Sequence, residues 1–516
     1  MPFFYLQYRP IYLGNVPTTL KYRQLPKSIF CKKGIRAMLF NSFEFIFLFL
    51  PLVFCIWVFL RKNYLPKLAI FSLLVSSLLF YAYWNPPFVF LLLASITINF
   101  FIQRGIFTLQ KTSCSRTAKT VLFCGITFNI LLIGYFKYKN FFLYNMDFIF
   151  GRVNTYQSIF LPLGISFFTF QQIACLIDSY KRKLGEIKFC EYALFVSFFP
   201  QLIAGPIVKY EELIPQIQKA AKDNSINLDT ICLGLSLFAF GLFKKITIAD
   251  YFSPISIMLF DSTSLPTFYD AILGTLAYTI QIYFDFSGYS DMALGLGFLF
   301  GVALPQNFNS PYQSLSIIDF WRRWHITLSN FLKDYIYIPL GGNRGGHTKK
   351  YINLLLTMLI GGLWHGAGWN FIIWGGLHGF YLVVNNLYRS KDRFIKLPNI
   401  ICWLLTFSAV SFAWIFFRVP SLSKAREIIY ALLSYAQIFS PSLHAINLAH
   451  DGLIKFVSSL IASIFISIFM PNAHKTLLHI SSRKYSVAVI SGICFAASLW
   501  MMTYTEKVRE FLYFQF

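Results

Sequence analysis

The sequence predicts an all-α membrane protein that crosses the bilayer many times, and three observations carry this prediction. First, 56% of the 516 residues are hydrophobic and only 13% are charged, whereas soluble domains carry roughly a quarter charged residues. Second, the apolar residues gather in runs close to the roughly 20 residues that span a bilayer. Third, about ten to twelve such runs are spread over almost the whole chain. We therefore expect a helical bundle rather than a soluble domain with one anchor.

The predicted elements follow the apolar runs in chain order. Spans are expected near 42–60, 68–84, 86–102, 120–136, 160–178, 190–208, 229–247, 268–284, 286–303, 351–365, 369–386, 400–417, 453–470 and 485–503. Between them, 304–350 is the longest stretch that is not plainly apolar, and it is rich in proline and glycine. We expect one integral membrane domain over 38–516, with the active-site region at about 281–370.

Residues 1–37 differ from the rest, because they hold seven basic residues, no acidic residue and no run long enough to span. The basic connecting loops at 61–67 and 103–119 place those loops in the cytoplasm and the start of the first span outside. A strongly basic tail before that span opposes this orientation. We therefore predict that the natural chain begins at Met38 and that 1–37 is a basic non-membrane extension. The alternative is a disordered tail.

Charge and cysteine usage exclude several classes of protein. The net charge of +24 does not indicate nucleic-acid binding, since the basic residues lie in short loops between apolar runs, as the positive-inside bias requires. The nine cysteines are scattered without a C-x-x-C pair, which predicts neither a disulfide framework nor a metal site. No internal repeat is evident, so an inverted-repeat transporter is not supported.

Two carboxylates, Asp285 and Asp291, lie within an apolar stretch beside aromatic and hydroxyl side chains. Ionisable groups at membrane depth are costly and need a reason. One interpretation is a helix break near Gly288 that lines a cavity, where irregular backbone is tolerated. The other is structural: each carboxylate pairs with a basic residue elsewhere and holds helices together.

A second polar cluster runs from Asp319 to His325 and contains Arg323 between two tryptophans, Trp321 and Trp324. Indole and guanidinium groups suit the membrane interface. Taken alone, His325 therefore indicates an interfacial anchor more than a catalytic residue.

A third cluster, 361–370, places His365 among glycines and beside Trp364, with apolar spans on both sides. Glycines allow a helix or ligand to approach the backbone closely. An imidazole can accept and return a proton near neutral pH. A buried structural histidine is the alternative.

The fourth cluster is the basic, glycine-rich stretch 341–350, which includes Asn343. Its spacing fails the G-x-x-x-x-G-K-[ST] pattern, so we interpret it as a flexible loop, with contact to an anionic cofactor as the alternative. A G-x-S-x-G elbow and an H-E-x-x-H pair are both missing from the sequence. Serine-hydrolase and zinc-protease mechanisms therefore lack their signatures.

Taken together and in order, these motifs resemble those of the membrane-bound O-acyltransferase family, over about residues 38–420. Within it, they are similar to the bacterial branch that O-acetylates extracytoplasmic polysaccharides such as peptidoglycan or alginate. The matching segments are 38–42, 162–167, 199–206, 241–245, 283–291, 319–329, 334–344 and 362–366.

The resemblance implies a membrane bundle of about 11–13 helices with a central tunnel or funnel in which two motif histidines meet. His365 matches the family's catalytic histidine and His325 its second motif position. Under this reading His365 acts as general base, while His325 positions the acyl group or polarises its carbonyl. Trp321, Trp324 and Trp364 would wall the site. Asp285, Asp291, Arg323 and Asn343 are further candidates for the substrate channel.

The resemblance also implies cofactor, partner and location. Acetyl-CoA would donate the acetyl group, without a metal, and a separate periplasmic esterase-like protein of the SGNH type would place it on the polysaccharide. The expected location is the bacterial inner membrane, with no nucleic-acid partner. Two alternatives stay open: D-alanine transfer to teichoic acids within the same family, and a transporter in which the histidines relay protons.

Overall fold

The structure is a computed structural model that describes residues 38–112, 114–390, 397–434, 442–443, 446, 450–480, 484–504 and 509–512. Within these ranges every regular element is a helix, and no strand occurs. The all-α prediction is confirmed. Residues 1–37 lie outside the described residues, so the predicted start at Met38 stays a prediction.

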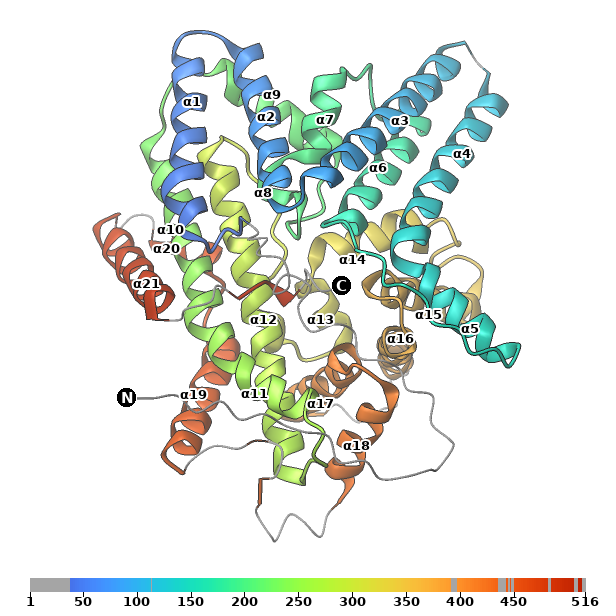
Figure 1. Cartoon of the computed structure of the whole chain (residues 1–516), viewed down its shortest axis with the longest axis vertical. Coiled ribbons are helices and arrows are strands. Elements are labelled where there is room, and N and C mark those ends of the chain that lie inside the picture. The colour runs from blue at the N-terminus through green and yellow to red at the C-terminus, as the bar shows by residue number, and fades with distance from the viewer. Residues whose placement is uncertain are drawn as a thin grey trace.

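Helices fill both halves of the chain (Figure 1). The first half contains η2 (Phe45–Phe49), α1 (Leu50–Lys62), α2 (Pro66–Trp84), α3 (Pro86–Lys111), α4 (Ser115–Ile133), η3 (Gly134–Tyr138), α5 (Lys139–Ile149), α6 (Ile165–Tyr180), α7 (Phe189–Ser197), α8 (Phe199–Leu202), α9 (Tyr210–Lys222), α10 (Leu228–Phe243), η4 (Lys244–Ala249) and α11 (Asp250–Phe260). The second half contains α12 (Phe268–Leu299), η5 (Pro311–Gln313), α13 (Ile317–Arg323), α14 (Ile326–Leu332), η6 (Lys333–Tyr337), α15 (Gly346–His365), α16 (Trp369–Ser390), α17 (Asn399–Arg418), α18 (Leu422–Leu433), α19 (His450–Phe469), α20 (Ala473–Ile480) and α21 (Lys484–Tyr504).

Eight helices in the described part of the chain are long and apolar enough to cross a membrane. They are Phe45–Lys62, Pro66–Trp84, Pro86–Lys111, Ser115–Ile149, Leu228–Phe260, Asn399–Arg418, Asp451–Phe469 and Tyr485–Tyr504. Large apolar side chains on these helices, such as Leu48, Phe90 and Phe123, are more than two-thirds exposed, which suits contact with lipid rather than water. The chain is a multi-pass membrane protein.

Three of the predicted spans are wrong in their boundaries. The span expected at 190–208 is broken at Phe198 into α7 and the single turn α8, and Pro200 lies in that turn. Proline lacks the backbone N–H that would continue the helix, so the apolar run does not form one span.

The spans expected at 268–284 and 286–303 are one continuous helix, α12, with Gly288 in its interior. The predicted break at Gly288 is therefore wrong. A Cβ at Gly288 would lie 2.7 Å from the carbonyl oxygen of Gly241, and one at Gly241 would lie 2.5 Å from that of Gly288. The glycine serves the close approach of α10 and α12 and does not bend the chain.

We predict that Gly288→Ala destabilises the protein by about 1–3 kcal/mol, because the added methyl forces two backbones apart. Gly492→Ala in α21 is the control, since a Cβ there meets nothing within 4 Å. Thermal unfolding of the two variants in the same detergent checks the prediction. Equal midpoints for both would contradict the packing role.

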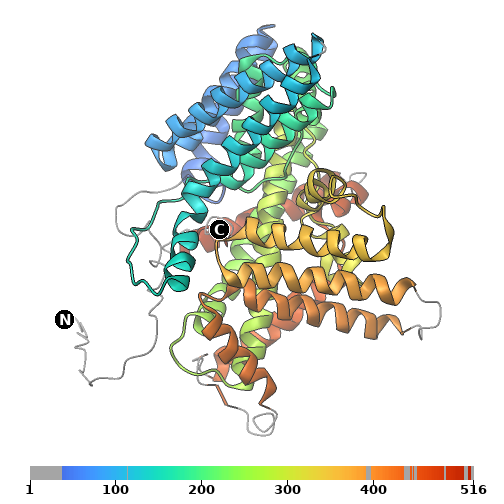
Figure 2. The ribbon, with the colours of Figure 1, turned by 90° about the vertical axis from the view of Figure 1, so that its right-hand side faces the viewer.

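Helix α12 runs along the middle of the molecule, and 26 of its 32 residues are buried (Figure 1). Figure 2 shows α15, α16 and α17, in yellow to orange, side by side and across the direction of α12; α16 packs on both of its neighbours. The short helices α13 and α14 lie within 304–350, the stretch that was predicted not to be plainly apolar. In the chain this stretch lies between α12 and the group α15 to α17.

The junction of α1 with α2 and the facing ends of α3 and α4 share the top of Figure 1. That common side agrees with the charge argument for the two basic loops.

Candidate active site

His365 is the last residue of α15 and is buried, with 3% of its surface exposed. Its ring lies edge-on to Trp374 of α16 at 5.0 Å between centroids and to Phe417 of α17 at 5.1 Å. The chain leaves the helix at Gly366, whose backbone is extended. When a helix ends inside a membrane protein, its last residue can place a polar side chain within the membrane region while the other helices stay continuous. The packed ends of three helices therefore position this imidazole.

His325 is fully buried and stands between α13 and α14 in the left-handed backbone region, with φ 42° and ψ 55°. A non-glycine residue adopts this conformation only at some cost, and such strain is found at functional sites. Asn307 holds the turn, because its carbonyl oxygen accepts from the amide of Ile326 at 3.0 Å. The backbone around His325 is thus fixed from a neighbouring loop.

The side chain of Asn307 also determines which nitrogen of His325 carries the proton. Asn307 Oδ1 accepts from the Thr327 amide at 3.3 Å and the Thr327 hydroxyl at 2.9 Å, which identifies this atom as the oxygen. His325 Nδ1 lies 3.1 Å from the same oxygen. In the neutral ring, Nδ1 therefore donates to Asn307, and Nε2 is the hydrogen-bond acceptor.

Trp364 contacts both histidines. Its ring lies 4.8 Å from His365 and 6.3 Å from His325, between centroids, and it stacks on Phe170 at 5.2 Å. The structure thus brings together three of the predicted site residues from two separate motifs. We call His325, Trp364 and His365 the histidine centre.

The other two predicted tryptophans are buried next to this centre. Trp321 lies 5.9 Å from Trp374, which itself contacts His365, and Trp324 lies 4.9 Å from Trp414. They form an aromatic wall from α13 to α16 and α17. Their role as the walls of a reaction site stays a prediction.

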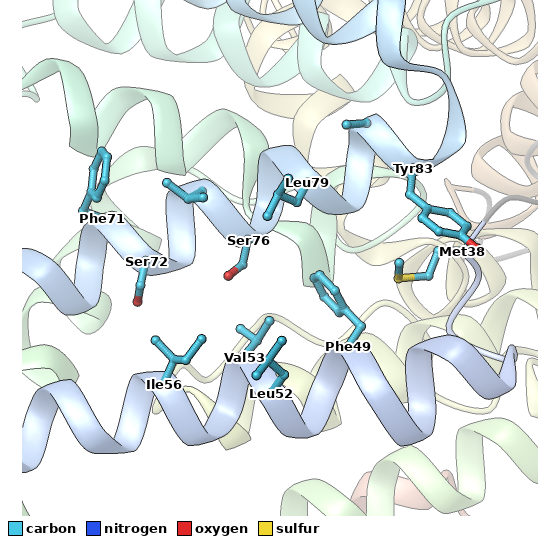
Figure 3. Close-up of a pocket in the computed structure, with 12 residues that line it drawn as sticks. Met38, Phe49, Leu52, Val53, Ile56, Phe71, Ser72, Ser76, Leu79 and Tyr83 are labelled. Carbon is cyan, nitrogen blue, oxygen red and sulfur yellow. The ribbon is translucent and has the colours of Figure 1, made fainter.

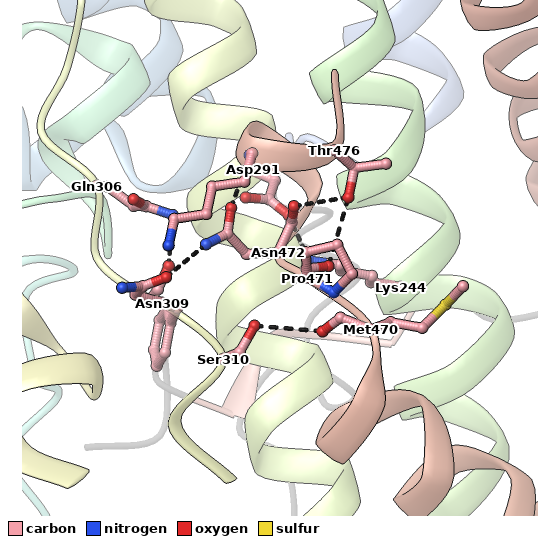
Figure 4. A network of polar contacts seen from close by, with 11 residues as sticks. Lys244, Asp291, Gln306, Asn309, Ser310, Met470, Pro471, Asn472 and Thr476 are labelled. Carbon is pink, nitrogen blue, oxygen red and sulfur yellow. Dashed lines mark hydrogen bonds and ion pairs between the residues drawn. The ribbon is translucent and has the colours of Figure 1, made fainter. Parts of the chain in front are cut away.

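Asp285 and Asp291 form ion pairs. Asp285 bonds Lys245 at 2.6 Å, with both side chains 2% exposed, and Asp291 bonds Lys244 at 2.6 Å. Figure 4 shows the second pair in a polar network in which Asn472 donates to Asn309 at 2.8 Å. The structural interpretation of the two carboxylates is therefore the one that the geometry supports, and the ion pairs join η4 to α12.

Arg323 and Asn343 are not brought to the histidine centre by any observed contact. Arg323 bonds Asp319 one turn earlier at 3.0 Å and the carbonyl of Asn309 at 3.4 Å. Asn343 is exposed in the loop before α15 and accepts from the Tyr337 hydroxyl. Their part in a substrate channel stays a prediction, as does the central tunnel.

An apolar groove of about 660 Å³ lies between α1 and α2 (Figure 3). Phe49, Leu52 and Ile56 line one side, and Phe71, Ser72 and Ser76 the other. Its lining has neither a histidine nor a carboxylate, so it offers no base for proton transfer. Among the described residues, no cluster of three or more histidine, cysteine or carboxylate side chains is placed to hold a metal ion.

A profile of the membrane-bound O-acyltransferase family matches residues 84–422, which include the whole histidine centre. The chain belongs to this family. It is an acyltransferase. This membership confirms the family resemblance of the sequence motifs that contain His325 and His365.

Two relatives of this acyltransferase match almost its full length, and a third matches about half of it. The peptidoglycan O-acetyltransferase of Helicobacter pylori is 40% identical over 93% of this chain and 98% of its own. The probable alginate O-acetylase AlgI of Azotobacter vinelandii is 37% identical over 93% of this chain and 100% of its own. The teichoic acid D-alanyltransferase of Streptococcus thermophilus is 28% identical over 47% of this chain and 61% of its own.

Sequence reasoning missed three polar residues at or next to the histidine centre. Asn307 orients His325; Lys137 contacts the end of α15; His378 of α16 accepts from the Trp321 indole at 3.3 Å and is fully buried. The sequence did contain a signal for Lys137 and His378, because each is an ionisable residue within an apolar run. Burying such a group in a membrane costs free energy, so its presence indicates a structural or functional role. Asn307 carried no such signal.

We predict that Asn307→Leu lowers acyl transfer by up to about 10²-fold, because His325 loses the bond that orients its ring. If Asn307 acts through His325, the double variant Asn307→Leu/His325→Ala will be no slower than His325→Ala alone. Rates of transfer for the four proteins of this cycle check the prediction. Fully additive losses would show that Asn307 acts elsewhere.

Proposed function

We propose that this acyltransferase moves acetyl groups from cytoplasmic acetyl-CoA across the membrane for O-acetylation of an extracytoplasmic polysaccharide of the peptidoglycan or alginate kind. The observation that carries the proposal is the histidine centre, in which two buried imidazole rings both contact the indole of Trp364. The names of the full-length relatives support acetyl as the group and a polysaccharide as its destination.

In the proposed reaction, His365 removes the proton from the incoming hydroxyl as its oxygen attacks the carbonyl carbon of the thioester. The carbon–sulfur bond then breaks, and the departing thiolate of coenzyme A takes the proton back from His365. A general base of this kind typically contributes about 10²–10⁴-fold. No metal is needed for any step.

His325 would position the reactants. Because its Nδ1 donates to Asn307, a neutral His325 presents an acceptor at Nε2, and accepting from the incoming hydroxyl would orient that group. The carbonyl-polarising role expected from the sequence needs a donor at Nε2, which this tautomer does not supply. Trp321, Trp324 and Trp364 would keep water from the thioester.

The proposed setting follows from the same branch of the family. The protein would lie in a bacterial inner membrane and would hand the acetyl group to a periplasmic SGNH-type partner, which esterifies the polymer. D-Alanine transfer to teichoic acids is the second candidate. It rests on a relative of lower identity that matches about half of this chain.

Chemical analysis of the cell wall tests the proposal. A strain lacking the gene is complemented with the wild-type chain, and ester-linked groups are released from its polysaccharides by mild alkali. We expect released acetate to return to the parental amount, with D-alanine esters unchanged. Restoration of D-alanine instead of acetate would favour the second candidate and contradict acetylation.

A further inference from the structure

The carboxyl end of α15 bears His365 and is capped by Lys137. The Lys137 ammonium donates to the carbonyl oxygens of Trp364 at 2.6 Å and of His365 at 3.0 Å, and to the Ser166 hydroxyl at 3.2 Å. These are three acceptors for the three donors of an ammonium group. A neutral amine has only two N–H groups and would turn a lone pair toward one of these oxygens. The geometry therefore fits the charged form.

The last turn of any α-helix leaves four carbonyls without helical partners, and inside a membrane each needs one. In α15 the two carbonyls before Trp364 are met by the Tyr138 hydroxyl, which donates to Leu363, and by the amide of Gly366, which donates to Gly362. Lys137 meets the remaining two. It is the one charged group among these three partners, and it faces the negative end of the helix dipole.

The segment that supplies Lys137 has unusual local structure. Lys137 and Tyr138 are the last residues of the π-helix η3, which joins α4 to α5. The wider turn of a π-helix shifts side chains out of α-helical register, and such turns are frequent at functional sites. Here it turns two consecutive polar side chains of the span Ser115–Ile149 toward the end of α15.

The ion pairs found among the described residues do not include Lys137. A lysine needed only for stability at depth is expected to pair with a carboxylate, as Lys244 and Lys245 do in this chain. Lys137 instead uses its charge on the backbone of Trp364 and His365, two members of the histidine centre.

We propose that Lys137 is a positioning residue of the acyl-transfer reaction: its charge fixes the last turn of α15 and so holds His365 in the reacting geometry. This inference rests on the proposed role of His365. A displacement of about 1 Å at a reacting group can cost about 10²-fold in rate. The effect should fall on the chemical step, because the Lys137 ammonium has three donors and directs them to Trp364, His365 and Ser166 of the protein.

The test compares Lys137→Met, Lys137→Gln and Lys137→Arg in membrane vesicles supplied with labelled acetyl-CoA, with kcat and KM measured for each. We expect Met and Gln to lower kcat by about 10- to 100-fold while the KM for acetyl-CoA stays within about threefold. Arg keeps the charge and should recover most of kcat. Lys139→Met is the control, since this neighbouring lysine is exposed and its ammonium lies over the Tyr135 ring.

Two results would overturn the inference. One is an unchanged kcat in the Met variant; the other is an equal kcat for Gln and Arg, which would leave the charge without a role. If the Met variant does not fold, the Gln–Arg comparison decides alone. His365→Ala in the same assay separates this failure from that of the proposed function: an active His365→Ala protein refutes the base, whereas an inactive one with an active Lys137→Met protein refutes only the positioning role.

Discussion

Replacing His365 by alanine is expected to lower acetyl transfer by about 10²–10⁴-fold, the range that a general base contributes. The physical reason is that the incoming hydroxyl then has no group to take its proton in a site closed by Trp374 and Phe417. Alkali-released acetate from the polysaccharide of cells carrying the variant measures the loss. The polysaccharide itself should still reach the cell surface, because the substitution removes a general base and does not block an export pathway.

The matched control is His347→Ala, because this histidine is exposed in the first turn of α15, at the opposite end of the helix from His365. We expect it to retain wild-type acetylation. The His365→Ala protein should be extracted in equal amount and unfold at a similar temperature, since a cavity at a helix end leaves the spans intact. Normal acetylation by His365→Ala would refute its role as base.

The second large effect is expected from Lys245→Met, which should destabilise the protein by about 3–5 kcal/mol, the cost of leaving buried charges without their partner. Lys245 is 2% exposed and bonds both Asp250 at 2.8 Å and Asp285 at 2.6 Å. Its loss leaves the carboxylates of Asp250 in α11 and Asp285 in α12 without the cation that both of them bond. Thermal unfolding in detergent measures the loss.

Lys244→Met is the control for this prediction. Its pair with Asp291 is 15% and 13% exposed, so the charge that it leaves behind is better solvated and the loss should be smaller. Neutralising both carboxylates in the Lys245→Met background, by Asp250→Asn and Asp285→Asn, should recover part of the stability. An unfolding temperature equal to wild type for Lys245→Met would show that the pair is not needed.

Hydropathy predicted most of the fold because lipid contact imposes a simple rule on the outer helices. It failed where a helix lies inside the protein: α12 is buried along most of its length, so its carboxylates, hydroxyls and glycines suggested an interruption where none exists. The break between α7 and α8 was missed because an apolar run containing Pro200 is compatible with a kinked span as well as with two pieces.

From the sequence, only those residues of the candidate site that lie within recognisable motifs could be predicted. His325, Trp364 and His365 were found through the family resemblance, and the structure brings them together. Lys137, which bonds the end of α15, lies 228 residues from His365 in sequence, whereas Asn307 lies only 18 residues before His325 but carried no signal as an uncharged residue. The pairing of Asp285 and Asp291 with consecutive lysines was equally hidden, because α10 and α12 approach through glycines whose role only the packed helices reveal.

A structure of the protein with a non-hydrolysable thioester analogue of acetyl-CoA would test the central claim most directly. The proposed mechanism predicts the acyl carbonyl carbon in the histidine centre, with room for a hydroxyl oxygen between it and His365 and with reacting atoms about 3–3.5 Å apart. An acyl group bound instead in the groove between α1 and α2, or at the loop before α15, would contradict it.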